Sequence, residues 1–247
     1  MILGCISESA DFEKRVMLNP EGVKKIKSLG IDVMIPKNYG NSSDYADDEY
    51  VKSGATISDN NSLCEKSDII LKISQRNLSE FKFKQGANLI IGFFNQADND
   101  ATNLVKQNKQ KVFALNLLPR ITRAQAMDVL SSQANLAGYK AVIDTAYEFQ
   151  KALPMMMTAA GTVTPAKYFI LGAGVAGLQA IATAKRLGAV VSATDVRLAS
   201  KEQVESLGAK FVFVEDAEDM ETSGGYAKEA SDDFKKKQEI LIKDTVK

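Results

Sequence analysis

Three glycines and one aspartate form the clearest chemical pattern in this sequence. Gly172, Gly174 and Gly177 have the spacing G-x-G-x-x-G. In such a pattern the first glycine permits a tight turn, the second lets a pyrophosphate approach the backbone, and the third lets a helix pack closely on a strand. Asp195 follows 23 residues after Gly172, where a carboxylate would hydrogen-bond the hydroxyls of an adenosine ribose. The pattern predicts a dinucleotide site that prefers NAD, because a carboxylate disfavours the 2′-phosphate of NADP.

The surrounding residues supply the elements that such a site needs. Residues 168–195 read as a strand, a glycine turn, a helix and a second strand with Asp195 at its tip. The amide groups at the start of that helix point at the phosphates, and the helix dipole favours negative charge there. A glycine turn can also be a mere tight connection, but the full strand-turn-helix-strand context favours a cofactor site. We expect further cofactor contacts from the flanking residues Val175, Ala176, Val196 and Arg197.

The first half of the chain alternates short apolar runs with helical stretches, which is typical of a mostly parallel α/β sheet. Asn19 can cap the first helix, Pro20 suits its first turn, and Gly30 can close it. The predicted strands of this half are Ile2 to Ser7, Asp32 to Pro36, Ile69 to Ile73, Asn88 to Gly92 and Lys111 to Ala114.

A long helix is predicted between the two halves of the sequence. From Thr122 to Leu153 there is no proline and no glycine except Gly138, and apolar residues recur at helical spacing. Beyond Asp195 we expect a helix at about 200–207 and a third strand at 210–214. A polar surface loop at 215–229 and a charged helix at about 233–242 should follow.

The sequence therefore predicts an α/β protein with two Rossmann-like, doubly wound parallel-sheet domains joined by a long helix. The expected parts are an N-terminal domain over residues 1–125, a linking helix over 126–153 and an NAD-binding domain over 154–247. In this fold the cofactor lies between the first and fourth strands. Because strands one to three are visible in the second domain, we expect a truncated domain with one wall of its cofactor cleft, and weak binding of NADH.

Composition narrows the possible functions. Among 247 residues, 31 basic side chains balance 31 acidic ones, so no net field favours nucleic acid as a partner. Cys5 and Cys64 lack metal-ligand spacing, so we expect two core thiols, a reducing compartment and no bound metal. We find no signal-peptide pattern and no apolar run of about eighteen residues, so a membrane role would come from a partner. Histidine is absent, which leaves acid-base chemistry to Lys, Tyr, Asp or Glu.

A second polar cluster lies in the segment PRITRAQAMDVLSSQANLAGY at residues 119–139. Gln125, Asp128 and either Ser131 or Ser132 are spaced by three or four residues, so we expect them to share one helix face at the nicotinamide end of the cleft. The alternative interpretation is a solvated first helical turn with Thr122 as its cap. The other polar residues of the cluster are Arg120, Arg123, Gln133 and Asn135.

The chain resembles the NAD(H)-binding component of the proton-translocating NAD(P) transhydrogenases, domain I of their alpha subunit, which is related to alanine dehydrogenase. The resemblance runs from Met1 to the end and is weaker before about Leu117. The motifs that carry it are PRITRAQAMDVLSSQANLAGYKAVIDTAYEF, PMMMTAAGTV, GAGVAGLQAIATAKRLGA, KEQVESLGAKF and GGYAKE.

The resemblance implies roles for individual residues. Arg120, Gln125, Asp128 and Ser131 would surround the nicotinamide, with Gln125 helping to align two nicotinamide rings. The glycine motif and Asp195 would hold the pyrophosphate and adenosine, and Tyr226 would lie on a loop that closes over NAD. Hydride transfer between nicotinamides takes no proton from an O–H or N–H group, so it needs alignment and electrostatics rather than a general base. A site without histidine suits that demand.

The resemblance also implies partners. Family members form dimers and pass hydride from NADH to NADP⁺ bound on a separate domain, while protons move through a membrane domain. The expected function is therefore NAD(P) transhydrogenation within a proton-translocating complex. The expected location is cytoplasmic, peripheral to the inner membrane through partner subunits.

Two other functions stay open. The nearest enzyme alternative is alanine dehydrogenase, since Arg15 and Lys72 match an arginine and a lysine that would bind its substrate. The active-site histidine of that enzyme is absent, with Phe93, Phe94 and Asn95 in its region, so we interpret Arg15 and Lys72 as structural remnants. The other alternative is a non-catalytic or fragmentary NAD-binding module.

Overall fold

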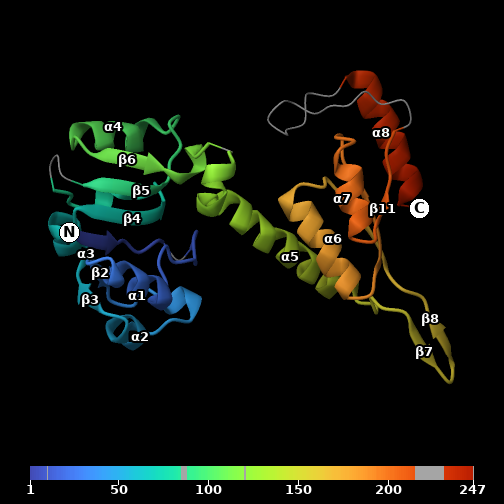
Figure 1. Ribbon diagram of the computed structural model, residues 1–247, viewed down its shortest axis with the longest axis horizontal. Coiled ribbons are helices and arrows are strands. Elements are labelled where there is room, and N and C mark those ends of the chain that lie inside the picture. Colours follow the sequence, from blue (N-terminus) through green and yellow to red (C-terminus); the bar gives the residue numbers. More distant parts are fainter. Residues whose placement is uncertain (10, 85–87, 120, 215–230, 247) are drawn as a thin grey trace. The chain divides into compact units, whose positions relative to one another are not determined.

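The protein has two compact units, Met1–Pro119 and Arg120–Lys247. The computed structural model describes residues 1–9, 11–84, 88–119, 121–214 and 231–246. Each unit contains its own parallel sheet with helices packed on it (Figure 1). The predicted architecture of two Rossmann-like α/β domains is confirmed. The predicted domain limits at residues 125 and 153 stay predictions, and the division between the compact units follows Pro119.

The sheet of the first unit has six parallel strands in the order β3-β2-β1-β4-β5-β6. This is the strand order of a doubly wound dinucleotide-binding fold, in which the switch point lies between the first and fourth strands. The four-residue strand β3 was not predicted from the sequence. The strands are β1 (Ile2–Cys5), β2 (Asp32–Pro36), β3 (Ala55–Ser58), β4 (Ile69–Ser74), β5 (Leu89–Phe93) and β6 (Lys111–Ala114).

Helices cover both faces of this sheet. Leu3 and Cys5 pack in the cluster that also contains Val23 of α1 and Tyr50 of α2. On the other face a Cβ added to Gly4 would lie 2.4 Å from a side-chain atom of Leu63 in α3. The α-helices are α1 (Pro20–Ser28), α2 (Asp47–Lys52), α3 (Asn60–Lys66) and α4 (Asn99–Gln107), and short 3₁₀ helices span Asn41–Ser43, Leu78–Glu80 and Leu115–Leu117.

The predicted boundaries of the first helix are confirmed. The Asn19 side chain accepts a hydrogen bond from the Gly22 N–H at 2.8 Å, and Pro20 is the first helical residue. Gly30 follows the helix with a positive φ of 76°, which suits glycine at a helix C-terminus. The local signals in this segment therefore determine both helix ends.

The second unit contains three parallel strands in the order β11-β10-β9. They correspond to strands one to three of a Rossmann fold, as predicted. A single apolar cluster joins this sheet to its helices through Val142, Ala180, Ile181, Val204 and Phe211. The elements are β9 (Lys167–Leu171), α6 (Val175–Arg186), β10 (Val190–Thr194), α7 (Ser200–Ser206), β11 (Lys210–Phe211) and α8 (Asp232–Thr245).

The long helix α5 (Val129–Phe149) is shorter at both ends than predicted. A separate 3₁₀ helix occupies Thr122–Met127, because Asp128 caps the α-helix and fixes its start. The alternative of Thr122 as the helix cap is therefore wrong. At the other end Gln150 adopts a left-handed conformation with φ of 54°, which stops the helix before Pro154.

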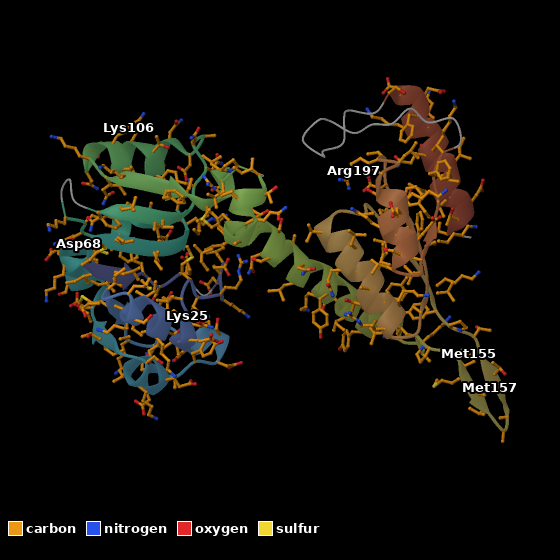
Figure 2. The ribbon with its side chains drawn as sticks, viewed as in Figure 1. Lys25, Asp68, Lys106, Met155, Met157 and Arg197 are labelled. Carbon is orange, nitrogen blue, oxygen red and sulfur yellow. The ribbon has the colours of Figure 1, made fainter. Side chains whose placement is uncertain are left out.

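The segment that precedes the glycine strand contains an antiparallel hairpin. Its strands are β7 (Met156–Thr158) and β8 (Gly161–Val163), and all six strand residues are exposed. Met155 and Met157 are 59% and 80% exposed, and Figure 2 shows both on this hairpin. The hairpin is therefore held by its backbone ladder rather than by a core.

Within the part of the chain that the structure describes, no helix has the length and apolar character needed to cross a membrane.

Candidate functional site

The glycine turn joins β9 to α6 in the second unit. Gly172 has a positive φ of 90°, a conformation that strains other residues. Its N–H donates to the Thr194 carbonyl at 2.8 Å, which ties the turn to the end of β10. A Cβ built on Gly174 meets no atom within 4 Å. The backbone of the turn is therefore open on the side of Gly174, as the approach of a pyrophosphate requires.

Helix α6 begins at this turn without a side-chain cap. Its N-cap is Gly174, which has no side chain to accept a hydrogen bond from the first helical turn. The amide groups there keep their partial positive charge, which favours a bound anion. A Cβ on Gly177 would lie 1.8 Å from the Gly172 carbonyl oxygen, so the helix can approach the turn only with glycine at this position. The residues present fit the pyrophosphate of a dinucleotide.

Asp195 directly follows β10 and lies beside the glycine turn. Its Oδ2 atom accepts a hydrogen bond from the Ala173 N–H at 2.7 Å. Arg197 donates from its backbone N–H and its Nε to Oδ1 at 2.9 and 2.8 Å, and from Nη2 to Oδ2 at 3.0 Å. The Asp195 side chain is 7% exposed. The structure thus brings together the predicted glycine turn, Asp195 and Arg197, with Val196 half-buried between the last two.

The charge of Asp195 is preserved by its hydrogen bonds. Burial opposes ionisation of the carboxyl, but the hydrogen bonds from Arg197 and from the Ala173 amide outweigh burial and lower its pKa. Asp195 is therefore an anion at neutral pH. Ala173 was not singled out from the sequence, and its place between the first two glycines was the available signal.

The second polar cluster has a different geometry from the one predicted. Asp128 is the N-cap of α5, where its Oδ1 accepts from the Ser131 N–H at 3.0 Å and its Oδ2 from the Ser131 hydroxyl at 2.6 Å. Gln125 belongs to the preceding 3₁₀ helix and is exposed. The expectation that Gln125, Asp128 and Ser131 share one helix face is wrong, because the α-helix begins after Asp128.

Two predicted site residues cannot be placed. Arg120 and Tyr226 lie outside the described residues, and so does the predicted surface loop at 215–229. Their roles, like those of Gln125, Asp128 and Ser131 toward a nicotinamide, stay predictions.

Helix α5 crosses α6 at the first turn of the glycine helix. A Cβ on Gly138 would lie 2.0 Å from the carbonyl oxygen of Ala176, so only glycine fits this crossing. Val142, one helical turn later, is 2% exposed. The helix capped by Asp128 is thus fixed beside the glycine turn. Gly138 was given no role from the sequence, although an isolated glycine in a helix often indicates close packing.

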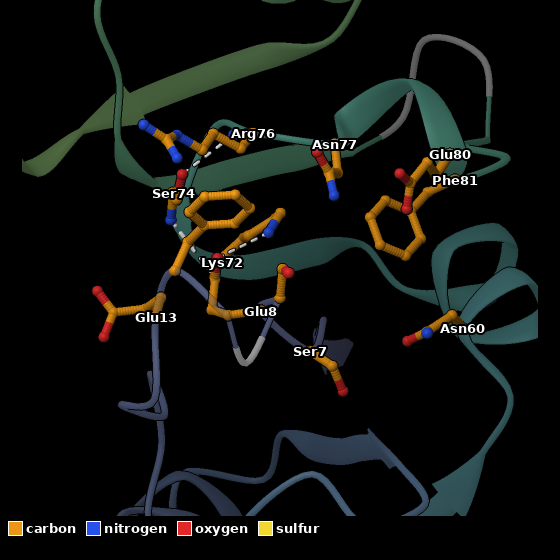
Figure 3. Close-up of a pocket in the computed structure, with 12 residues that line it drawn as sticks. Ser7, Glu8, Glu13, Asn60, Lys72, Ser74, Arg76, Asn77, Glu80 and Phe81 are labelled. Carbon is orange, nitrogen blue, oxygen red and sulfur yellow. Dashed lines mark hydrogen bonds and ion pairs between the residues drawn. The ribbon is translucent and has the colours of Figure 1, made fainter. Parts of the chain in front are cut away.

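The first unit has a cavity of about 630 Å³ at the carboxyl ends of β1 and β4 (Figure 3). Lys72 Nζ lies 2.8 Å from Glu8 Oε2, and the two side chains are only 3% and 6% exposed. The other Glu8 oxygen accepts from the Ile73 N–H at 2.7 Å. The buried Lys72 side chain is therefore paired with a carboxylate that the backbone of its own strand, β4, also holds.

Arg15 is also paired. Its Nε and Nη2 donate to the two carboxylate oxygens of Glu13 at 2.8 and 2.6 Å. Between Phe93 and Asn95, the Phe94 N–H donates to the Asn116 side chain at 2.8 Å. Both cations that an amino-acid substrate would need thus have a carboxylate partner within the protein.

Comparison with known proteins identifies the family. Residues 4–137 match the N-terminal domain of alanine dehydrogenase/PNT, and residues 141–247 match the C-terminal domain. The chain belongs to the alanine dehydrogenase/PNT family.

Within the alanine dehydrogenase/PNT family the chain is similar to transhydrogenase subunits. It is 49% identical over 245 residues to the first part of NAD(P) transhydrogenase subunit alpha of Rhodospirillum rubrum, an alignment that covers 95% of this chain and 64% of that protein. It is 47% identical to a crystal structure of transhydrogenase from Sinorhizobium meliloti, with a TM-score of 0.86 over 100% of this chain and 67% of that one. Identity to alanine dehydrogenase of Staphylococcus epidermidis is 26%, over 84% of this chain and 56% of that enzyme. The chain thus spans less than two thirds of the Rhodospirillum rubrum protein.

Proposed function

We propose that this protein is the NAD(H)-binding component of a proton-translocating NAD(P) transhydrogenase. In this function it passes hydride from NADH to NADP⁺ held by a partner domain. The observation that carries the proposal is the joined geometry of the open glycine turn, the uncapped start of α6 and the ionised Asp195. The 49% identity to a transhydrogenase alpha subunit supports the same conclusion.

The cofactor-binding role falls on residues at the carboxyl ends of β9 and β10. Gly172, Gly174 and Gly177, with the amides of Val175 and Ala176, would hold the pyrophosphate at the start of α6. Asp195 would accept hydrogen bonds from the adenosine ribose, and Val196 and Arg197 would flank it. NAD supplies the hydride-carrying nicotinamide when bound. The residues proposed to surround this ring are Arg120, Gln125, Asp128 and Ser131, and Tyr226 is proposed to lie on a loop that closes over NAD.

The chemistry required of these residues is limited. Gln125 has an exposed amide that can align a ring, whereas Asp128 and Ser131 already bond each other in the helix cap. None of them needs to abstract a proton, because hydride transfer between two nicotinamides takes none from an O–H or N–H group. A chain without histidine suits this reaction.

The proposed function includes partners. We propose an NADP-binding domain, a membrane proton-channel domain and a second copy of the chain, and thus a location at the cytoplasmic side of the inner membrane through partner subunits. The exposed apolar side chains of the β7–β8 hairpin and of α5 are surface that a homodimer would bury. They include Met155, Met157, Val163, Leu136, Tyr139 and Tyr147.

A reconstituted assay tests the proposed function. Purified protein is mixed with the NADP-binding domain of a transhydrogenase, NADPH and an NAD⁺ analogue whose reduced form absorbs at a distinct wavelength. We expect reduction of the analogue that depends on both proteins. Matched reactions without the partner domain, and with NADH, pyruvate and ammonia, serve as controls.

The controls separate the three functions. Oxidation of NADH that depends on pyruvate and ammonia, without analogue reduction, would replace the proposal with alanine dehydrogenase. Binding of NADH with neither activity would leave an NAD-binding module. The paired states of Lys72 and Arg15 argue against the first of these outcomes.

A further inference from the structure

Arg197 makes an unusually complete set of contacts with Asp195. Its backbone N–H, Nε and Nη2 donate to both oxygens of the carboxylate at 2.8 to 3.0 Å. A guanidinium pairs with a carboxylate in this forked way because its donors lie in one plane. The geometry of Arg197 is therefore fixed by Asp195.

The pair lies at the edge of the proposed adenosine site. Asp195 ends β10 and touches the glycine turn through Ala173, and its side chain is 7% exposed. The Arg197 side chain is 21% exposed, so it is more open to solvent than the carboxylate with which it pairs. Figure 2 shows Arg197 in the part of the second unit that follows β10. A phosphate on the ribose 2′ position would arrive at this edge, since Asp195 is proposed to bind that ribose.

The charges of the pair favour different nucleotides. A 2′-phosphate brings about two negative charges, which the Asp195 carboxylate repels. A guanidinium is the side chain that best matches the oxygens of a phosphate, and arginines near this position hold the 2′-phosphate in NADP-dependent Rossmann domains. The same pair thus contains one group that rejects NADP and one that could bind it.

We infer that Asp195 and Arg197 together determine whether the protein binds NAD or NADP. The Asp195 carboxylate holds the Arg197 guanidinium in an ion pair and so keeps it from binding the 2′-phosphate of NADP. The inference rests on the proposed function, because it concerns how the same site distinguishes NAD from NADP. Removing the carboxylate charge unmasks Arg197, and the protein then accepts NADPH.

The inference is tested with wild type, Asp195→Asn, Arg197→Ala and the double variant Asp195→Asn with Arg197→Ala, to which a second Asp195 variant and a control are added. Each is titrated with NADH and with NADPH, and binding is followed by nicotinamide fluorescence. Asn can still accept the Ala173 hydrogen bond, so the turn keeps a partner. Asp195→Ser is a second variant that also offers an acceptor, and circular dichroism checks that each protein is folded.

Wild type is expected to bind NADH and to discriminate against NADPH. Asp195→Asn should bind NADPH about tenfold more tightly than wild type and NADH about tenfold more weakly, the size expected for one charge-assisted contact. The double variant should lose the gain in NADPH affinity. The gain should also shrink as salt is raised from about 0.05 to 0.5 M, because the contact is ionic. Asp233→Asn, which removes an exposed partner of Lys237 on α8, is the matched control and should change neither affinity.

Two results would overturn the inference. In one, Asp195→Asn and Asp195→Ser are folded but bind NADPH no more tightly than wild type. In the other, the double variant keeps the gain, which would show that Arg197 is not its source. Failure of wild type to bind NADH would instead reject the proposed function, and the inference with it.

Discussion

Gln125 differs at the residue scale from the other residues proposed to surround the nicotinamide. Asp128 and Ser131 bond each other at the start of α5, whereas the Gln125 side chain is exposed on the 3₁₀ helix before it. Gln125→Asn shortens the side chain by one methylene and keeps its amide. We expect hydride transfer to slow by about tenfold or more while NADH affinity changes by less than about twofold. Single-turnover kinetics and NADH titration measure the two effects.

Gln107→Asn is the matched control for Gln125→Asn. Gln107 is exposed at the end of α4 in the first unit, so the same chemical change should affect neither rate nor affinity. A large loss of NADH affinity in Gln125→Asn would contradict the alignment role and assign Gln125 to binding.

Asp195 should make the stability of the protein depend on pH. Its pKa is lowered in the folded protein, so its ionised form stabilises the fold above the ordinary aspartate pKa of about 3.9. This contribution is lost as the pH falls through the lowered value. We expect Asp195→Asn to unfold at a lower temperature than wild type at pH 7, with a difference that shrinks below about pH 4. Thermal unfolding at several pH values checks this, and a difference that is constant with pH would contradict it.

At the element scale, the crossing of α5 and α6 depends on Gly138. Replacing glycine by alanine in an exposed helix usually stabilises by about 1 kcal/mol. Here the new Cβ would meet the Ala176 carbonyl at 2.0 Å, so we expect Gly138→Ala to destabilise the protein by about 1–3 kcal/mol instead. NADH affinity should fall as well, because Ala176 lies in the first turn of α6. Urea denaturation and NADH titration measure both effects.

The neighbouring Ala137 provides the control for this helix crossing. It is exposed on α5, so Ala137→Gly should cost about 1 kcal/mol through helix propensity alone and leave NADH affinity unchanged. A stabilising effect of Gly138→Ala would show that the crossing adjusts to the added methyl group.

The same elements show what the sequence could and could not predict. Local signals were sufficient where one residue determines the conformation, as at Asn19, Pro20 and Gly30 around the first helix. The glycine turn with Asp195 was predicted because its spacing reflects one compact unit of strand, turn and helix. The start of α5 was predicted wrongly because helical apolar spacing continues through the 3₁₀ segment and Asp128 was not recognised as the cap.

Contacts between distant elements were not predictable from periodicity. The fit of Gly138 against Ala176 depends on how α5 and α6 meet, and the pairing of Glu8 with Lys72 joins residues 64 positions apart. The strand β3 was missed, and the three-residue strands β7 and β8 were missed because they are too short to show a period.

At the scale of the whole molecule, the two units are proposed to have different roles in nucleotide binding. The residues proposed to bind NAD lie in the second unit, whereas the buried pair of Lys72 and Glu8 lies in the first. Glu8→Gln removes one partner of a buried ion pair, so we expect a loss of about 3–5 kcal/mol in stability. NADH affinity should change by less than about twofold. Urea denaturation and NADH titration measure the two quantities.

Glu21→Gln is the control for the buried pair. Glu21 pairs with Lys25 on the surface of α1, where loss of an ion pair should change stability little. The double variant Glu8→Gln with Lys72→Met should recover stability, because it removes the unpaired buried charge. A large loss of NADH affinity in Glu8→Gln, in a folded protein, would show that the first unit contributes directly to the nucleotide site.

The methionines of the β7–β8 hairpin are more accessible to oxidants than the two cysteines of the chain. The sulfur atoms of Cys5 and Cys64 are buried, and burial raises the pKa of both thiols to about 12, so neither is a ready thiolate. The thioethers of Met155, Met156 and Met157 lie open to solvent. Peroxide would convert them to polar sulfoxides while the backbone ladder of the hairpin persists. Oxidative damage would therefore reach the apolar surface of this hairpin before it reached either core.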